Sequence, residues 1–163
     1  MCLKLSKENA NAKIADHDII CYKLMYGYCD DNGNVGIVSP YQNTRHPFNK
    51  TIAANGKVVK DYWNEMCDFL VIGKGVIHSY SFLEGAMDDM ENYFDGNIIF
   101  KAIIPKGTKY YVGDFCGIPA FGSKKLIITD TIVGVHQPDG DEGIMLADYL
   151  SKNFKMDYCT ISE

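Results

Sequence analysis

The segment Gly75-Val-Ile-His-Ser-Tyr-Ser-Phe-Leu-Glu84 passes from a strand pattern into a helix start. Residues 75–80 have the β-branched and aromatic content of a strand. Ser81 and Glu84 then have the spacing of a capping box, in which each side chain bonds the backbone N–H of the other residue. We therefore expect a helix from Ser81 to about Phe94. Its buried stripe would comprise Phe82, Ala86, Met90 and Phe94 (or Tyr93), and its solvated face Asp88, Asp89 and Glu91.

Predicted strands dominate the sequence on either side of this segment. They cover residues 18–25, 35–38, 97–104, 109–112, 124–129 and 131–135. We expect residues 1–15 to be a loose lead-in, 115–122 a loop, and 142–155 a C-terminal helix. Many strands with few helices and no regular βαβ repetition are typical of the α+β class. The expected fold is a compact single domain over residues 1–163, with a mixed or antiparallel split sheet.

The composition excludes several classes of protein. The 163 residues are 47% hydrophobic and 23% charged, as in an ordinary globular domain. The net charge of −5 argues against a nucleic-acid partner, which would select a basic face. The sequence has no apolar run of the kind found in a secretory signal or a membrane helix. The six cysteines form no C-x-x-C pair, so reduced thiols, a cytoplasmic protein and no metal site are expected.

Cys2 could have a catalytic role instead of being a simple reduced thiol. Removal of Met1 would expose the amine of Cys2, which could then act as base for its own side chain. N-terminal nucleophile hydrolases work in this way.

The junction His78-Ser79-Tyr80-Ser81 is the first candidate site. A strand that ends at a helix N-terminus presents free backbone N–H groups and the positive end of the helix dipole. Such a junction can bind a phosphate group. The alternative is that Ser81 only caps the helix, while His78 and Tyr80 alternate with Ser79 across a strand.

Two further groups of residues could contribute to the same site. Arg45 and His46 lie in the irregular segment 39–54, which could close over a nucleotide by stacking and charge pairing. Tyr22 and Lys23 are neighbours on the first strand, so their side chains face opposite sides. Lys23 matters only if it faces a cleft, because an exposed lysine on an edge strand is the usual case.

The order of these segments resembles the ADP-ribosyltransferase superfamily. That family has a first strand with an arginine or histidine, and a second strand with a Ser-Thr-Ser type motif that leads into a helix. A third strand then ends in a Pro-x-Gly turn, and a later strand is headed by a catalytic glutamate. Here Lys23 stands near the place of the arginine, and 78–81 stands at the second motif. Residues 98–104 precede Pro105-Lys106-Gly107, and Ser123 or Lys125 takes the place of the glutamate.

The chain is also similar to short proteins of gut bacteria and their phages. These begin Met-Cys-Leu, carry a His-Ser motif and contain an Ile-Pro-Lys-Gly-Thr-x-Tyr-Tyr block, which is found here at residues 104–111.

The junction at residues 78–81 and the missing glutamate favour a cytosolic protein that binds a nucleotide-type ligand. NAD, ADP-ribose or a cyclic signalling nucleotide would suit the cleft, and a phage could use such a protein to sequester a host defence signal. An active transferase or nucleotide-cleaving enzyme is the first alternative, with His78 as base because a histidine titrates near neutral pH. A protein-interaction module is the second, since eleven tyrosines and eight phenylalanines provide aromatic surface. No separate cofactor is expected.

Overall fold

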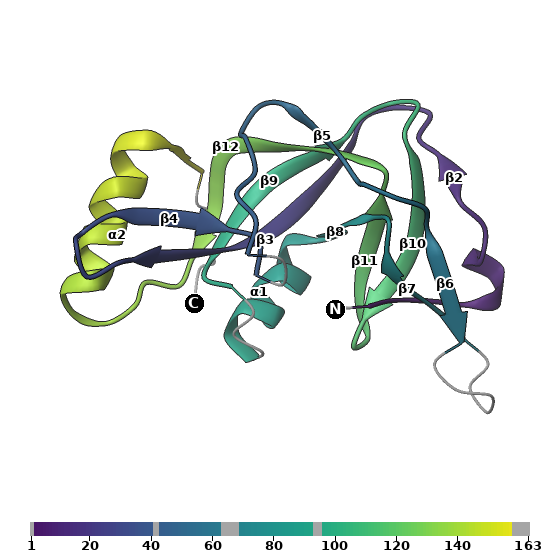
Figure 1. Ribbon diagram of the computed structural model, residues 1–163, viewed down its shortest axis with the longest axis horizontal. Coiled ribbons are helices and arrows are strands. Elements are labelled where there is room, and N and C mark those ends of the chain that lie inside the picture. The colour runs from purple at the N-terminus through teal and green to yellow at the C-terminus, as the bar shows by residue number, and fades with distance from the viewer. Residues whose placement is uncertain (1, 41–42, 63–68, 93–95, 158–163) are drawn as a thin grey trace.

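A computed structural model of the chain describes residues 2–40, 43–62, 69–92 and 96–157 (Figure 1). In these residues the strands form one curled sheet, and two α-helices pack against it. In chain order the elements are β1 (Leu3–Leu5), a 3-10 turn (Lys7–Asn9), β2 (Lys13–Ile14), β3 (Ile19–Cys29), β4 (Val35–Val38), β5 (Thr51–Ala53), β6 (Val59–Tyr62), β7 (Leu70–Lys74), β8 (Ile77–Tyr80), α1 (Leu83–Asn92), β9 (Ile98–Ile104), β10 (Lys109–Phe115), β11 (Ile118–Ser123), β12 (Lys125–Val135), α2 (Gly140–Asn153) and β13 (Lys155–Met156).

The sheet is weakly joined near its centre. Its strand order is β13-β12-β9-β3-β8-β11-β10-β1-β7-β6, with β4 on β3, β5 on β12 and β2 on β10. The pairs are antiparallel except for β12 with β13. β3 pairs with β9 from Ile19 to Met25, but in the described chain it meets β8 at the single pair Tyr22 and Tyr80. The α+β class and the largely antiparallel sheet are confirmed.

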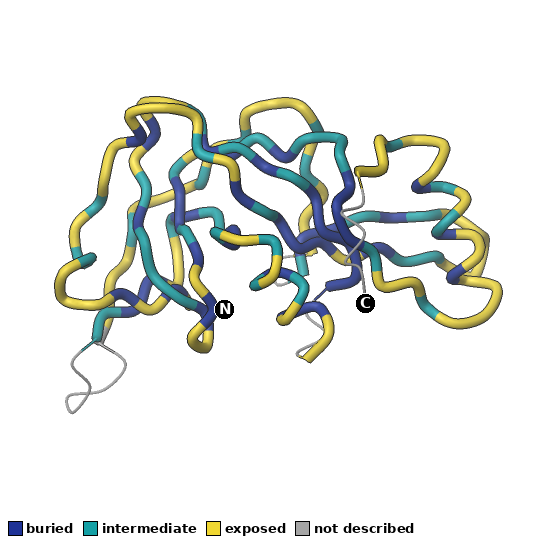
Figure 2. The backbone as a smooth tube through the Cα atoms, turned by 180° about the vertical axis from the view of Figure 1, so that it is seen from behind, coloured by how far each residue is buried: buried dark blue, intermediate teal, exposed yellow. Residues whose placement is uncertain are grey.

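The central strands are apolar on both faces because both faces are covered. In Figure 2 the buried backbone is concentrated in these strands. On one face, which we call the α1 face, Leu24 and Ile99 pack with Ala86 and Met90 of α1. On the opposite face, which we call the α2 face, Met25 and Phe100 belong to a second core with Leu146 and Leu150 of α2. A strand covered on both sides loses the polar alternation of a half-exposed one.

The segment 43–53 also covers the α2 face. The ring of Phe48 packs at 4.8 Å from the rings of both Phe100 and Phe154. Ile52 joins the same core, and β5 pairs with β12. The expectation of an irregular segment therefore holds for residues 43–50, whereas residues 51–53 form the short strand β5.

The prediction of a loose lead-in over residues 1–15 was wrong. β1 lies inside the sheet, between β10 and β7, and Leu3 and Leu5 are fully buried. Lys4 pairs with Val71 on one side and with Asp114 on the other. A three-residue strand has too little alternation to identify from sequence, although the Leu-x-Leu pattern is consistent with it.

The predicted loop over residues 115–122 was also wrong. β10 and β11 form a hairpin through Cys116 and Gly117, which both take positive φ (49° and 86°). These angles are those of a type I′ turn, which usually carries Asn-Gly. Gly117, Pro119 and Gly122 indicated a loop, yet Pro119 is accommodated within β11 opposite Asp114.

Helix α1 begins later than the capping box predicts. It starts at Leu83, and Phe82 is 60% exposed because it precedes the first turn. Ala86 and Met90 are buried as predicted, but Asp89, expected on the solvated face, is also buried. The expected end near Tyr93 or Phe94 lies outside the described residues.

The C-terminal helix is confirmed with a shift of two residues. α2 spans Gly140–Asn153 instead of 142–155, and Lys155–Met156 forms β13. Asp139 precedes the helix in an extended conformation, and Asp141 and Glu142 lie in the first turn, where the helix dipole favours acidic side chains.

Candidate functional site: a buried lysine beside a cavity

Lys23 lies where the sheet is weakly joined. The residue is only 8% exposed, because β3 is a central strand of the sheet. The Nζ atom donates a hydrogen bond of 2.7 Å to the backbone carbonyl of His78. The carbonyl of His78 lies on β8, two residues before Tyr80, which forms the single residue pair between β3 and β8. The side chain of Lys23 therefore supplies a hydrogen bond where backbone pairing between the two strands has ended. The expectation of an exposed edge lysine is therefore corrected.

The Lys23 ammonium has no anionic partner in the described part of the chain. Burial lowers its pKa to about 8, and the nearby Cys21 opposes this shift only weakly. At neutral pH the side chain is still mostly protonated, because its pKa lies above the pH. A buried charge normally needs a counter-charge as well as hydrogen bonds. The site therefore holds an uncompensated positive charge.

Two buried serine hydroxyls share the α2 face with Lys23. Ser79 lies across from Lys23 between the two strands, and Ser123 lies on β11 opposite Ile77. Ser79 interacts with the thiol of Cys21, which is a weak hydrogen-bonding group. Neither hydroxyl has a nitrogen or oxygen partner among the described residues. Buried hydroxyls usually find such a partner, so these two have unused hydrogen-bonding capacity.

A cavity of about 460 Å³ lies beside this cluster, although Lys23, Ser79 and Ser123 are not themselves among its lining residues. Its lining residues come from the covering segment and from the turn between β7 and β8, and they are Thr44, His46, Ile52, Ala53, Ala54, Asn55, Gly75, Val76 and Ile77. Ile77 immediately precedes the residue whose carbonyl Lys23 bonds. Burial lowers the pKa of the His46 ring, and the positive charge of Lys23 lowers it further. We call this space the Lys23 cavity.

The structure divides the predicted site between two faces. Lys23, Ser79 and His46 gather on the α2 face, whereas His78 and Tyr80 lie on the α1 face, which Tyr22 also adjoins. His78 and Tyr80 pack edge-on against Phe115, with ring centroids 4.9 and 5.6 Å apart. This division follows from the alternation of side chains along β3 and β8.

His78 is neutral at physiological pH. Burial, and then the charge of Lys23, lower the pKa of its ring to about 3. Its Nε2 atom and the hydroxyl of Tyr80 are buried without a hydrogen-bond partner among the described residues. A group with this pKa is a poor general base near pH 7.

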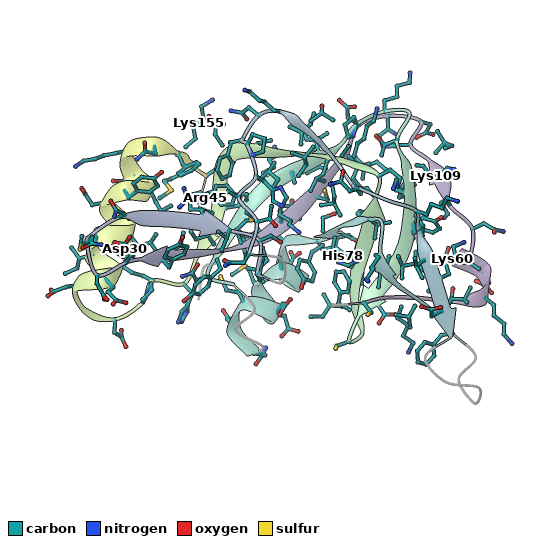
Figure 3. All side chains as sticks on the ribbon, viewed as in Figure 1. Asp30, Arg45, Lys60, His78, Lys109 and Lys155 are labelled. Carbon is teal, nitrogen blue, oxygen red and sulfur yellow. The ribbon has the colours of Figure 1, made fainter. Side chains whose placement is uncertain are left out.

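Arg45 is not brought to the Lys23 cavity. Its guanidinium is exposed and hydrogen-bonds Tyr28, and this bond together with Tyr149 raises its pKa. In Figure 3 Arg45 lies toward the β4 end of the molecule and His78 toward the opposite end. Arg45 and His46 are consecutive, and only His46 turns toward the cavity.

Ser81 is also separate from the cavity. Its backbone N–H donates to the carbonyl of Pro119 at 3.1 Å. In the described structure no hydrogen bond joins it to Glu84, because the helix begins two residues after Ser81. Ser81 therefore does not form the capping box that the sequence suggested.

Sequence reasoning missed the cavity walls. Thr44, Asn55 and Gly75 lie in segments that connect strands, and the positions of such segments in space depend on the fold and not on local patterns. Gly75 has a φ of 84°, and an added Cβ would stand 2.4 Å from the carbonyl oxygen of Lys57. The glycine is the one detectable signal, since such a backbone conformation favours glycine.

The comparisons with known proteins leave the family open. No family model matches the chain, no curated protein matches it, and no solved structure matches it. Among the described residues, no group of three or more His, Cys, Asp or Glu side chains could hold a metal ion. None of the helices in the described ranges has the length and apolar character needed to cross a membrane.

Proposed function

We propose that this protein binds an anionic, nucleotide-type ligand in the Lys23 cavity. The observation that carries the proposal is the buried ammonium of Lys23, which bonds a carbonyl but lacks a counter-charge. A phosphate group would supply that charge and would accept hydrogen bonds from Lys23 and from the hydroxyl of Ser79. The size of the cavity, about 460 Å³, falls within the range of small-molecule sites.

The order of strands supports the nucleotide class. The three strands that carry the resemblance to ADP-ribosyltransferases, β3, β8 and β9, are direct neighbours in the sheet. Lys23, at the place of that family's arginine, therefore meets Ser79, at the place of its second motif. NAD, ADP-ribose and cyclic nucleotides are the ligands that this resemblance implies.

Binding without turnover is the activity we favour. β3, β8 and β11 carry no Asp or Glu, so a carboxylate that could polarise a ribose is absent from these strands. His78 is held neutral with a pKa near 3. A protein of this kind would sequester its ligand, as a phage protein directed against a host signal would.

A thermal-shift series tests the proposal. Purified protein is heated with NAD, ADP-ribose, cyclic ADP-ribose or a cyclic dinucleotide. A ligand at about 100 times its Kd adds about 2.7 kcal/mol, or roughly 5–10 °C in Tm for a chain of this size. We expect one ligand class to give this shift with the wild type and with Lys125→Met, an exposed lysine on β12. Lys23→Met should abolish it. A shift that persists in Lys23→Met would contradict the proposal.

A further inference from the structure

A second cavity, of about 390 Å³, is lined by three lysines. Lys57 comes from the turn before β6, Lys109 from the start of β10, and Lys124 from the link between β11 and β12. Gly56, Val58 and Tyr111 complete the lining, so the wall has three positive charges and no carboxylate. We call this space the lysine cavity. Figure 3 shows Lys109 and Lys60 on the same side of the molecule, on β10 and β6.

The three lysines differ in what their ammonium groups already bond. Lys124 is fixed, because its Nζ atom donates to the carbonyls of Gly75, Gly56 and Ala54 at 2.8, 2.9 and 3.4 Å. Lys57 and Lys109 are exposed, and their ammonium groups have no hydrogen bond or ion pair in the described structure. Lys124 therefore contributes a fixed charge, while Lys57 and Lys109 have free N–H groups for a ligand.

An aromatic ring forms part of the same wall. Tyr111 is only 6% exposed, and the Nζ atom of Lys60 lies 4.9 Å from the centre of its ring. Lys60 also donates to the carbonyl of Ala10, which fixes its position. A fourth positive charge is thus held close to the cavity, in a protein whose net charge is −5. Such a concentration of one sign attracts a multiply charged anion.

The two cavities are neighbours. Ala54 and Asn55 line the Lys23 cavity, and the next residue, Gly56, lines the lysine cavity. The Lys124 ammonium bonds carbonyls on both sides of this boundary, those of Gly75 and Ala54 from the first cavity and that of Gly56 from the second. One elongated molecule could therefore place an end in each cavity by crossing the backbone at residues 54–56.

We infer that the lysine cavity is a phosphate subsite for the same ligand, so that the ligand carries a phosphate or pyrophosphate group at a distance from the group bound by Lys23. This inference rests on the proposed function and narrows it to a nucleotide with separated anionic groups, such as a dinucleotide or an ADP-ribose-type molecule.

Calorimetry with inorganic pyrophosphate tests the lysine cavity alone. The titration is made in the Lys23→Met variant, which lacks the cation of the first cavity. We expect Lys57→Gln with Lys109→Gln to weaken pyrophosphate binding roughly tenfold or more, because two charge-assisted contacts are lost. Lys106→Gln, an exposed lysine in the turn before β10, is the matched control and should leave the affinity unchanged. Absent binding, or equal affinity in both variants, overturns the subsite.

A second titration, with ADP-ribose and an intact Lys23, tests whether one ligand spans both cavities. We expect the paired Lys57→Gln and Lys109→Gln substitutions to weaken binding roughly tenfold, and Lys23→Met to weaken it independently. Weakening by Lys23→Met alone overturns the shared ligand but leaves the proposed function intact. Weakening by the paired substitutions alone contradicts the proposed function. A wild-type chain that does not bind ADP-ribose overturns the spanning ligand, whatever the pyrophosphate result.

Discussion

The side-chain amide of Asn97 hydrogen-bonds both backbone groups of Gly27. Its Oδ1 atom accepts the N–H of Gly27 at 2.7 Å, and its Nδ2 atom donates to the carbonyl of Gly27 at 2.8 Å. Both bonds are buried. Asn97 immediately precedes β9, so these bonds extend the contact between β3 and β9 past the last backbone pair, that of Met25 with Ile98. A Cβ at residue 27 would lie 2.5 Å from Cδ1 of Ile98, so the Ile98 side chain would have to move to accommodate it.

Replacing Asn97 with alanine should therefore destabilise the fold strongly. Two buried backbone groups would lose their partners, at a cost of about 1–3 kcal/mol each. We expect a loss of about 2–5 kcal/mol in the free energy of unfolding, measured by urea denaturation. Asn153→Ala, which removes an exposed amide at the end of α2, is the control and should change the stability by about 0.5 kcal/mol or less. Similar losses in the two variants would contradict this role of Asn97.

The stability of the protein should rise with pH because of Lys23. Its pKa falls from 10.5 in the unfolded chain to about 8 in the fold. Between these values the unfolded state binds more protons than the folded state, so deprotonation favours folding. Below pH 8 the full penalty applies, about 3 kcal/mol for a shift of this size.

Lys23→Met removes this titration and isolates its effect. We expect the stability of the variant relative to the wild type to fall by about 3 kcal/mol as the pH rises from 7 to 10.5. Urea denaturation of both proteins across this range measures the change. A difference that is constant with pH would show that the Lys23 ammonium is not buried in solution.

His78 should make the protein sensitive to acid. Its pKa falls from 6.5 to about 3, so the unfolded state takes up a proton between these values while the folded state does not. The contribution of the neutral His78 ring to the free energy of unfolding is therefore at its full value above pH 6.5, and it decreases as the pH falls below that value. Between pH 7 and pH 4 we expect a loss of about 3 kcal/mol from this residue.

His78→Phe keeps an aromatic ring against Phe115 and removes the titration. We expect this variant to lose less stability than the wild type between pH 7 and pH 4. His17→Phe, at an exposed histidine, provides the comparison and should follow the wild type. Parallel pH profiles for all three proteins would refute the burial of the His78 ring.

The first strand should be essential to the fold. Leu5 is fully buried between β10 and β7, and its truncation to alanine leaves a cavity that costs about 2–5 kcal/mol. Ile14→Ala removes a side chain that is 61% exposed and should cost about 0.5 kcal/mol or less. Thermal unfolding of the two variants separates a structural strand from a loose lead-in, which would give two small effects.

Much of the fold follows from local patterns in the sequence. The apolar run at β9, the strand at β3 and the C-terminal helix are long enough for periodicity to identify them. β1 and β11 were missed for physical reasons. Leu3 and Leu5 are buried only because distant strands surround them, and β11 carries a proline and glycines that are more common in loops.

The candidate site was predictable only in part. Lys23, His46 and Ser79 were chosen from their chemistry, and the structure brings them to one face. The alternation of β8 separates His78 and Tyr80 from them, and this alternation was already visible in the sequence. Arg45 could not be placed, since its direction depends on the contact with Tyr28, a residue distant in sequence. The lysine cavity joins residues from three segments, and no local pattern links them.

The position of β1 has a consequence for synthesis on the ribosome. This strand is translated before either of its neighbours, and it pairs with Leu70–Ile72 and with Asp114. Leu3 and Leu5 therefore stay exposed until most of the chain has been translated. Pairing between residues so distant in sequence slows folding, since a large loop must close before the contact forms. We therefore expect the closing of β7 and β10 around β1 to be a late step of folding.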